Sequence, residues 1–96
     1  MRTQSLTVAT LVDLLESAVR DLARLSTAIA EFQSAVWSAS DDDLVMTPDQ
    51  REIFRDLAYD LDYFEPDALV RAESSSYFGA DVAIDEIRQA LEKLRA

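Results

Sequence analysis

The segment that decides the fold is Thr47-Pro48-Asp49-Gln50. Threonine is a favourable helix N-cap, proline suits the first helical position, and glutamine three residues after the cap completes a capping box. The apolar residues that follow recur at intervals of three and four, the period of an amphipathic α-helix. We therefore predict a helix that begins after Thr47 and buries one stripe, made of Ile53, Phe54, Leu57, Leu61 and Phe64.

This predicted helix runs into Pro66. Proline cannot continue a helix, and it also disfavours helical geometry at the residue before it, here Glu65. Glu65 and Asp67 should therefore project from a turn. Carboxylates at a helix C-terminus meet the negative end of the helix dipole, so a cation is expected to offset them. That cation is either Arg71 of this chain or a basic residue of a partner.

The chain before this segment also has the helical period. The first stripe is Val8, Leu11, Val12, Leu15, Ala18, Val19 and Leu22, and Leu25, Ile29, Phe32 and Val36 continue its phase. Residues 7–38 could thus form one helix, although globular helices average about 11–12 residues. Because Ser26 and Thr27 are competent N-caps, we predict a break there and two antiparallel helices.

The C-terminal part predicts one more helix, which Asp81 caps. Its buried stripe is Ile84, Ile87, Leu91 and Leu94, with Ala83 and Ala90 beside it. Before it, residues 68–80 are interpreted as a loop or short helical turn anchored by Leu69 and Phe78. The prediction is an all-α chain, a small antiparallel four-helix bundle that forms one domain over residues 1–96.

The composition argues against catalysis and cofactor binding. The chain has no histidine, no cysteine and a single glycine, so the usual general base, thiol nucleophile, most transition-metal ligands and a glycine-rich phosphate loop are missing. We expect no enzyme activity and no cofactor. Asp41-Asp42-Asp43 suggests calcium, but the glycine and ligand spacing of a calcium loop are absent, so solvated loop acids are the preferred interpretation.

The charge points to a basic partner. The net charge is −10, from 19 acidic and 9 basic residues, and such a chain repels nucleic acid and anionic membrane. Solubility alone is the other explanation. No apolar run approaches the roughly 20 residues that cross a bilayer. Residues 1–6 lack the uninterrupted apolar segment of a secretory signal, so a cytoplasmic location is expected.

The candidate contact surface is Asp60-Leu61-Asp62-Tyr63-Phe64-Glu65-Pro66-Asp67. It has too many charges for a core and too many rings for an ordinary solvated turn. On the preceding helix, one face collects Asp49, Glu52, Asp56 and Asp60, with Tyr59 and Tyr63 beside them. We expect these four acids to supply a long-range field and the tyrosines to add aromatic anchors, although Tyr59 could instead only flank the core.

The same residues, with others nearby, resemble a known protein family. Phe64-Glu65-Pro66-Asp67, preceded by Asp62 and followed by Arg71 and a helix ending Ile87-Arg88-Gln89-Ala90-Leu91-Glu92-Lys93-Leu94, resembles the bacterial self-protective colicin-like immunity proteins, the family of colicin D immunity. Ala28-Ile29-Ala30-Glu31-Phe32 resembles the family's second helix. The resemblance is firmest over residues 60–96.

The resemblance implies a small acidic four-helix bundle that binds the C-terminal nuclease domain of a cognate toxin, one that cuts transfer RNA in its anticodon loop. It places Asp62, Glu65 and Asp67 in the basic active site of that nuclease, where they take the place of RNA phosphates. The wider candidate set of toxin-binding residues is Asp56, Tyr59, Asp60, Asp62, Tyr63, Glu65 and Asp67.

The chain departs from the family pattern at two places. Tyr63 lies where a member of the family has a basic residue, and the segment from Asp67 to Asp81 is longer. Both touch the implied interface, so the cognate toxin need not be a colicin D homologue. Two other hypotheses stay open: an acidic helical adaptor or regulator that binds another basic protein, and a bundle that dimerises without a toxin.

Overall fold

The computed structural model describes residues 6–40 and 42–95, which fold mainly into helices. The longer helices are α1 (Val8–Arg20), α2 (Leu25–Ser38), α3 (Pro48–Asp60) and α5 (Ala80–Arg95). The shorter elements are the single-turn helix α4 (Ala68–Arg71), the 3₁₀ turns η1 (Leu22–Arg24) and η2 (Leu61–Tyr63), and the strands β1 (Leu6–Thr7) and β2 (Leu44–Val45). The predicted all-α class is confirmed.

The N-terminal region forms two helices, as predicted, but the break lies before the predicted position. Asp21 adopts an extended conformation, and its carboxylate accepts a hydrogen bond from the amide of Ala23 at 3.1 Å. Ser26 and Thr27 instead lie exposed within α2. The break at Asp21 lets Leu25 begin α2 as a buried residue, while Leu22 is left 65% exposed. Burial of Leu25 therefore accompanies the earlier break.

The start of α3 confirms the capping box. The amide of Gln50 donates to Thr47 Oγ1 at 3.1 Å, and the amide of Thr47 donates to Gln50 Oε1 at 3.0 Å. Along the helix and into η2, Phe54, Leu57 and Leu61 are buried. Ile53 and Phe64, the other members of the predicted stripe, are partly buried against the same core.

We expect Thr47→Ala to lower the free energy of unfolding by about 1 kcal/mol, because the variant loses the side chain that satisfies an amide of the first turn of α3. Urea unfolding followed by circular dichroism measures the loss. Thr27→Ala, an exposed change inside α2, is the control and should leave stability near that of the wild type. Equal losses in the two variants would contradict a capping role.

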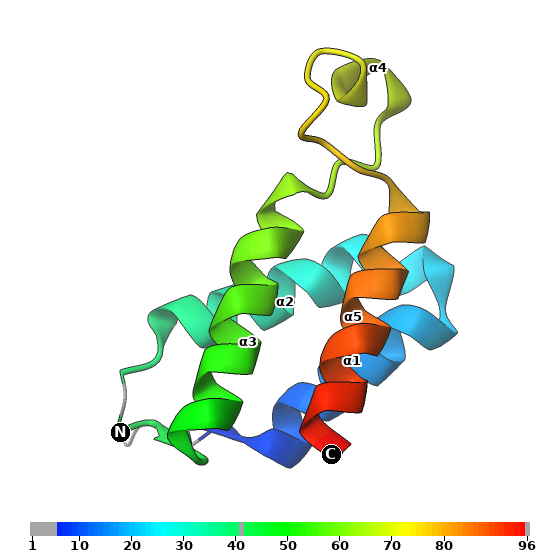
Figure 1. Ribbon diagram of the computed structural model, residues 1–96. Coiled ribbons are helices and arrows are strands. Elements are labelled where there is room, and N and C mark those ends of the chain that lie inside the picture. Colours follow the sequence, from blue (N-terminus) through cyan, green and yellow to red (C-terminus); the bar gives the residue numbers. More distant parts are fainter. Residues whose placement is uncertain (1–5, 41, 96) are drawn as a thin grey trace.

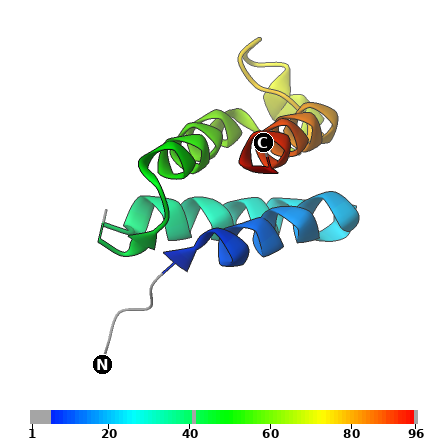
Figure 2. The ribbon, with the colours of Figure 1, turned by 60° about the horizontal axis from the view of Figure 1, so that its bottom comes forward.

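The helices pack as two antiparallel pairs. α1 contacts α2 and α5, and α3 contacts α2 and α5. Figure 2 shows α1 and α2 side by side in one layer and α3 with α5 in the other, and in Figure 1 the second pair lies across the first. The rings of Phe32 and Phe54, both almost fully buried, meet between the layers with centroids 6.1 Å apart. Gln33 adds a hydrogen bond across this junction, from its Nε2 to the carbonyl of Ala58 at 3.1 Å.

A short parallel pairing that was not predicted joins β1 to β2, with Leu6 opposite Leu44 and Thr7 opposite Val45. The pairing holds the loop after α2 against the start of α1. In that loop Asp43 accepts hydrogen bonds from the amide and hydroxyl of Ser40, at 3.2 and 3.0 Å. Asp41, the first of the three loop acids, lies outside the described residues, and the described residues contain no cluster that could hold a metal ion.

The C-terminal predictions are partly confirmed. α4 is the expected short turn and Phe78 packs against the core, but Leu69 is 83% exposed and anchors nothing. Asp81 does not cap the last helix, because α5 begins at Ala80 and the first intrahelical bond is accepted by the carbonyl of Gly79. The predicted stripe is correct, with Ile87 and Leu91 buried and Ile84 and Leu94 partly buried; Ala83 and Ala90 are buried beside it.

Within residues 6–40 and 42–95, no helix is long and apolar enough to cross a membrane.

Candidate functional site

The acidic segment 60–67 lies where α3 ends and leads into a protrusion beyond the ends of α3 and α5, seen at the top of Figure 1. Its position is fixed by an isolated parallel bridge between Phe64 and Phe78. The amide of Phe78 donates to the carbonyl of Tyr63 at 3.0 Å, and the amide of Glu65 donates to the carbonyl of Phe78 at 2.8 Å. The segment is thus tied to the chain just before α5.

Arg71, one of the two sources of positive charge expected at this turn, lies against the turn but does not bond its carboxylates. Arg71 Nη1 donates to the backbone carbonyl of Glu65 at 2.7 Å and not to a carboxylate. Gly79 allows this approach, because a Cβ atom at that position would lie only 3.2 Å from Arg71 Cζ and Nη1. Arg71 therefore stabilises the backbone of the turn, while the carboxylates of Glu65 and Asp67 have other hydrogen-bond partners.

The carboxylates of Glu65 and Asp67 are held by neighbouring amides. Glu65 Oε2 accepts from the amide of Asp67 at 3.2 Å, and Asp67 Oδ1 accepts from the amide of Leu69 at 2.9 Å, which caps α4. An ionised carboxylate has two oxygens and about four acceptor positions, so each group keeps capacity for further donors. Asp62 is exposed in η2. As predicted, Glu65 and Asp67 follow the helix in a turn, and the structure shows that this turn is ordered by local bonds.

Two tyrosines, Tyr59 and Tyr63, belong to the same acidic region of the chain. Tyr59 is 65% exposed and Tyr63 is 39% exposed, and their rings meet edge to face with centroids 6.3 Å apart. The charge of Tyr59 and a hydrogen bond to it raise the pKa of Tyr63 above its ordinary value, with smaller contributions from lost hydration and from Asp62 and Asp60. Tyr59 therefore does not simply flank the core, since most of its surface faces solvent.

We expect Tyr59→Phe to lower the pKa of Tyr63 toward the usual tyrosine value of about 10. A raised pKa in the folded state stabilises the protein below the unfolded pKa, and this stabilisation is lost as pH rises through the folded value. The variant should therefore lose less of its stability in alkaline solution. The ¹³C NMR shift of Tyr63 Cζ against pH measures the pKa, with Tyr77→Phe as control. An unchanged Tyr63 midpoint in Tyr59→Phe would contradict the coupling.

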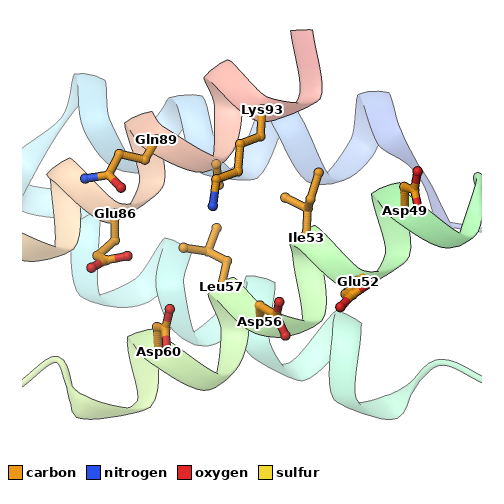
Figure 3. A pocket seen from close by; sticks show the side chains of 10 residues that line it. Asp49, Glu52, Ile53, Asp56, Leu57, Asp60, Glu86, Gln89 and Lys93 are labelled. Atoms are coloured by element: carbon orange, nitrogen blue, oxygen red, sulfur yellow. The ribbon is translucent and has the colours of Figure 1, made fainter. Parts of the chain in front are cut away.

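The predicted acidic face of α3 borders an open groove of about 260 Å³ between α3 and α5. Figure 3 shows Asp49, Glu52, Asp56 and Asp60 along one side, facing Glu86, Gln89 and Lys93 of α5. The floor includes Ile53, Leu57 and Ala90. The four α3 acids thus share one face, as their spacing predicted. Their opposition to α5 could not be predicted, because it depends on how the two helices pack.

The candidate toxin-binding residues divide into two groups. Asp62, Tyr63, Glu65 and Asp67 lie in the turn beyond α3, while Asp56, Tyr59 and Asp60 lie on the last turns of α3 itself. The two groups meet through the Tyr59 and Tyr63 ring contact. Sequence reasoning gave α5 no part beside these groups, although the spacing of Glu86, Gln89 and Lys93 indicates a common helix face.

Comparison of the chain with protein-family models, curated proteins and solved structures gives no match. A function can therefore be inferred only from the residues of this chain and their geometry.

Proposed function

We propose that this protein is an immunity protein that binds and neutralises the nuclease domain of a cognate bacterial toxin, of the colicin D-like kind that cleaves transfer RNA. In this proposal Asp62, Glu65 and Asp67 enter the basic active site of the nuclease and occupy the positions of RNA phosphates. The likeness of residues 60–96 to the colicin-like immunity family motivates the proposal.

The observation that carries the proposal is the order in the acidic turn. The Phe64 and Phe78 bridge fixes its backbone, Arg71 holds the Glu65 carbonyl, and amides hold one oxygen each of Glu65 and Asp67. Ordering flexible groups during binding costs free energy, so a surface that is ordered beforehand binds more tightly. A preformed set of carboxylates is what a decoy for a phosphate backbone requires.

Electrostatics supports the same partner. A nuclease that binds the RNA backbone must present lysines and arginines, because the backbone carries one negative charge at each phosphate. This chain carries a net charge of −10, and the acids of the α3 face add to the field near the turn. Opposite fields accelerate association, which protects the producing cell from free toxin.

The proposal also covers the scaffold, the aromatic anchors and the composition of the complex. Helix α1 contacts α2 and α5, and α3 contacts the same two helices. We propose that these four helices form a small antiparallel four-helix bundle, which holds the turn rigidly. Tyr59 and Tyr63 are proposed as aromatic anchors, since exposed tyrosines beside charges are common at the energetic centres of interfaces. The complex is proposed to contain one copy of each protein in the cytoplasm and to use no cofactor.

The test begins with the neighbouring gene. It should encode a protein that ends in a small basic nuclease domain, and expression of that domain should arrest bacterial growth. Coexpression of this chain should restore growth, and light scattering should show a one-to-one complex. Arrest that persists with this chain present would overturn the proposal. A basic neighbour that is bound but has no nuclease activity would favour the adaptor hypothesis.

A further inference from the structure

Two hollows lie on either side of the Phe64 to Pro66 segment. The first, of about 510 Å³, is bounded by η1, the start of α2 and the start of α5, and its apolar lining includes Leu22, Leu25 and Val82. The second, of about 220 Å³, runs along α2 and includes Ile29, Ala30 and Leu61. Ser26, Phe64 and Pro66 line both hollows, so the two form one surface, called here the Phe64 trough.

The trough exposes apolar side chains next to acids. Leu22 is 65% exposed and Val82 is 44% exposed, although both belong to residue types that usually gain from burial. Asp62 lines the second hollow and Asp81 lines the first. Arg71 also lines the first hollow, but its Nη1 is already bonded to the Glu65 carbonyl. The trough therefore presents apolar surface with Asp62 along one hollow and with both Asp81 and the cationic Arg71 along the other.

We propose that the Phe64 trough binds apolar side chains of a cationic protein partner, whose lysines or arginines meet Asp62, Glu65 and Asp67 at the same time. This inference rests on the proposed function and deepens it, because it states where the binding energy arises. Charges at an interface govern association rate and orientation more than affinity, whereas a few well-packed anchors supply most of the affinity. The acidic turn therefore determines which partner associates and in which orientation, and the trough supplies most of the affinity.

Charge complementarity favours this occupant over others. A second copy of the chain also carries −10, so its own acids would oppose Asp62, Glu65 and Asp67 of the first copy. Like charges opposed across an interface cost several kcal/mol. A small molecule is also disfavoured, since sites for such ligands enclose most of the ligand surface, whereas both hollows lie open at the protein surface.

The test uses three short blocked peptides and the full ¹⁵N-labelled chain, with binding followed by amide NMR shifts. One peptide combines lysine with leucine, the second combines lysine with serine, and the third combines serine with leucine. We expect the lysine–leucine peptide to bind about tenfold more tightly than the lysine–serine peptide, since its leucine removes apolar surface from water in the trough. It should shift the amides of Leu22, Leu25 and Val82, whereas the lysine–serine peptide should shift only amides of residues 62–65 and 67.

Single substitutions test whether the tenfold difference in affinity arises in the trough. Leu22→Ser and Val82→Ser should each remove most of the tenfold difference, and Trp37→Ser should preserve it, because Trp37 is an exposed apolar residue outside the trough at the other end of α2. Equal affinities for the two lysine peptides would overturn the trough proposal and leave the proposed function standing. Failure of both lysine peptides to shift residues 62–67 would count against the proposed function itself. Equal binding of the serine–leucine peptide, or dimerisation through the trough, would overturn the cationic occupant.

Discussion

Replacing Asp62, Glu65 and Asp67 together by asparagine, glutamine and asparagine is expected to abolish protection against the toxin while leaving the fold intact. A cation of the nuclease that is left buried without its partner costs about 2–5 kcal/mol, which exceeds what the intact pair adds to the affinity, so three losses should weaken binding at least a thousandfold. The amide variants keep the size of each side chain, and an asparagine in place of Asp67 can still cap α4. Growth under toxin expression and isothermal titration with the nuclease domain measure the two effects.

A matched control carries the same change of charge elsewhere. Asp13→Asn, Glu31→Gln and Glu92→Gln remove three exposed acids from α1, α2 and α5, and we expect this variant to protect nearly as well as the wild type. Its association rate should fall modestly, because the long-range field is weaker. If the control and the turn variant lose protection equally, net charge and not the turn would carry the activity. Full protection by the turn variant would remove Asp62, Glu65 and Asp67 from the site.

Truncation of the central aromatic pair should have the largest effect on stability. We expect Phe32→Ala to lower the free energy of unfolding by about 3–5 kcal/mol, because it deletes a fully buried ring and leaves a cavity beside Phe54. Native domains are stable by only about 5–15 kcal/mol, so this variant should approach the limit of folding. Urea unfolding measures the change.

Trp37→Ala is the control on the same helix. Trp37 is an exposed aromatic residue, so its loss should change stability by less than about 1 kcal/mol. A loss for Phe32→Ala no larger than that for Trp37→Ala would mean that the layers are not held together at the Phe32 and Phe54 contact. The comparison therefore tests the packing of α2 on α3 directly.

Local patterns in the sequence predicted the helices well. The capping box at Thr47 and the stripe containing Phe54 and Leu57 are determined within a few residues, and both are confirmed. The break between α1 and α2 was misplaced because Ser26, Thr27 and Asp21 are all competent caps. The choice of Asp21 accompanies burial of Leu25 in tertiary packing, which the local sequence does not contain.

Contacts between distant residues could not be predicted. The pairing of β1 with β2 and the bridge between Phe64 and Phe78 join segments whose own sequences show no strand pattern. At the candidate site, Pro66 correctly indicated a turn carrying Glu65 and Asp67. The bond from Arg71 to the Glu65 carbonyl depends on the space beside Gly79, and the Phe64 trough depends on three separate elements meeting. These features depend on tertiary packing, which the local sequence does not determine.

The bridge between Phe64 and Phe78 also has an evolutionary consequence. It closes the protrusion at its base, and none of the described side chains from Glu65 to Tyr77 belongs to the hydrophobic core. Outside the bonded residues Glu65, Asp67 and Arg71, substitutions there can accumulate with little loss of stability, since surface changes away from special contacts usually cost less than about 0.5 kcal/mol. The sequence of this loop can therefore change to suit a different partner while the helical scaffold keeps its stability.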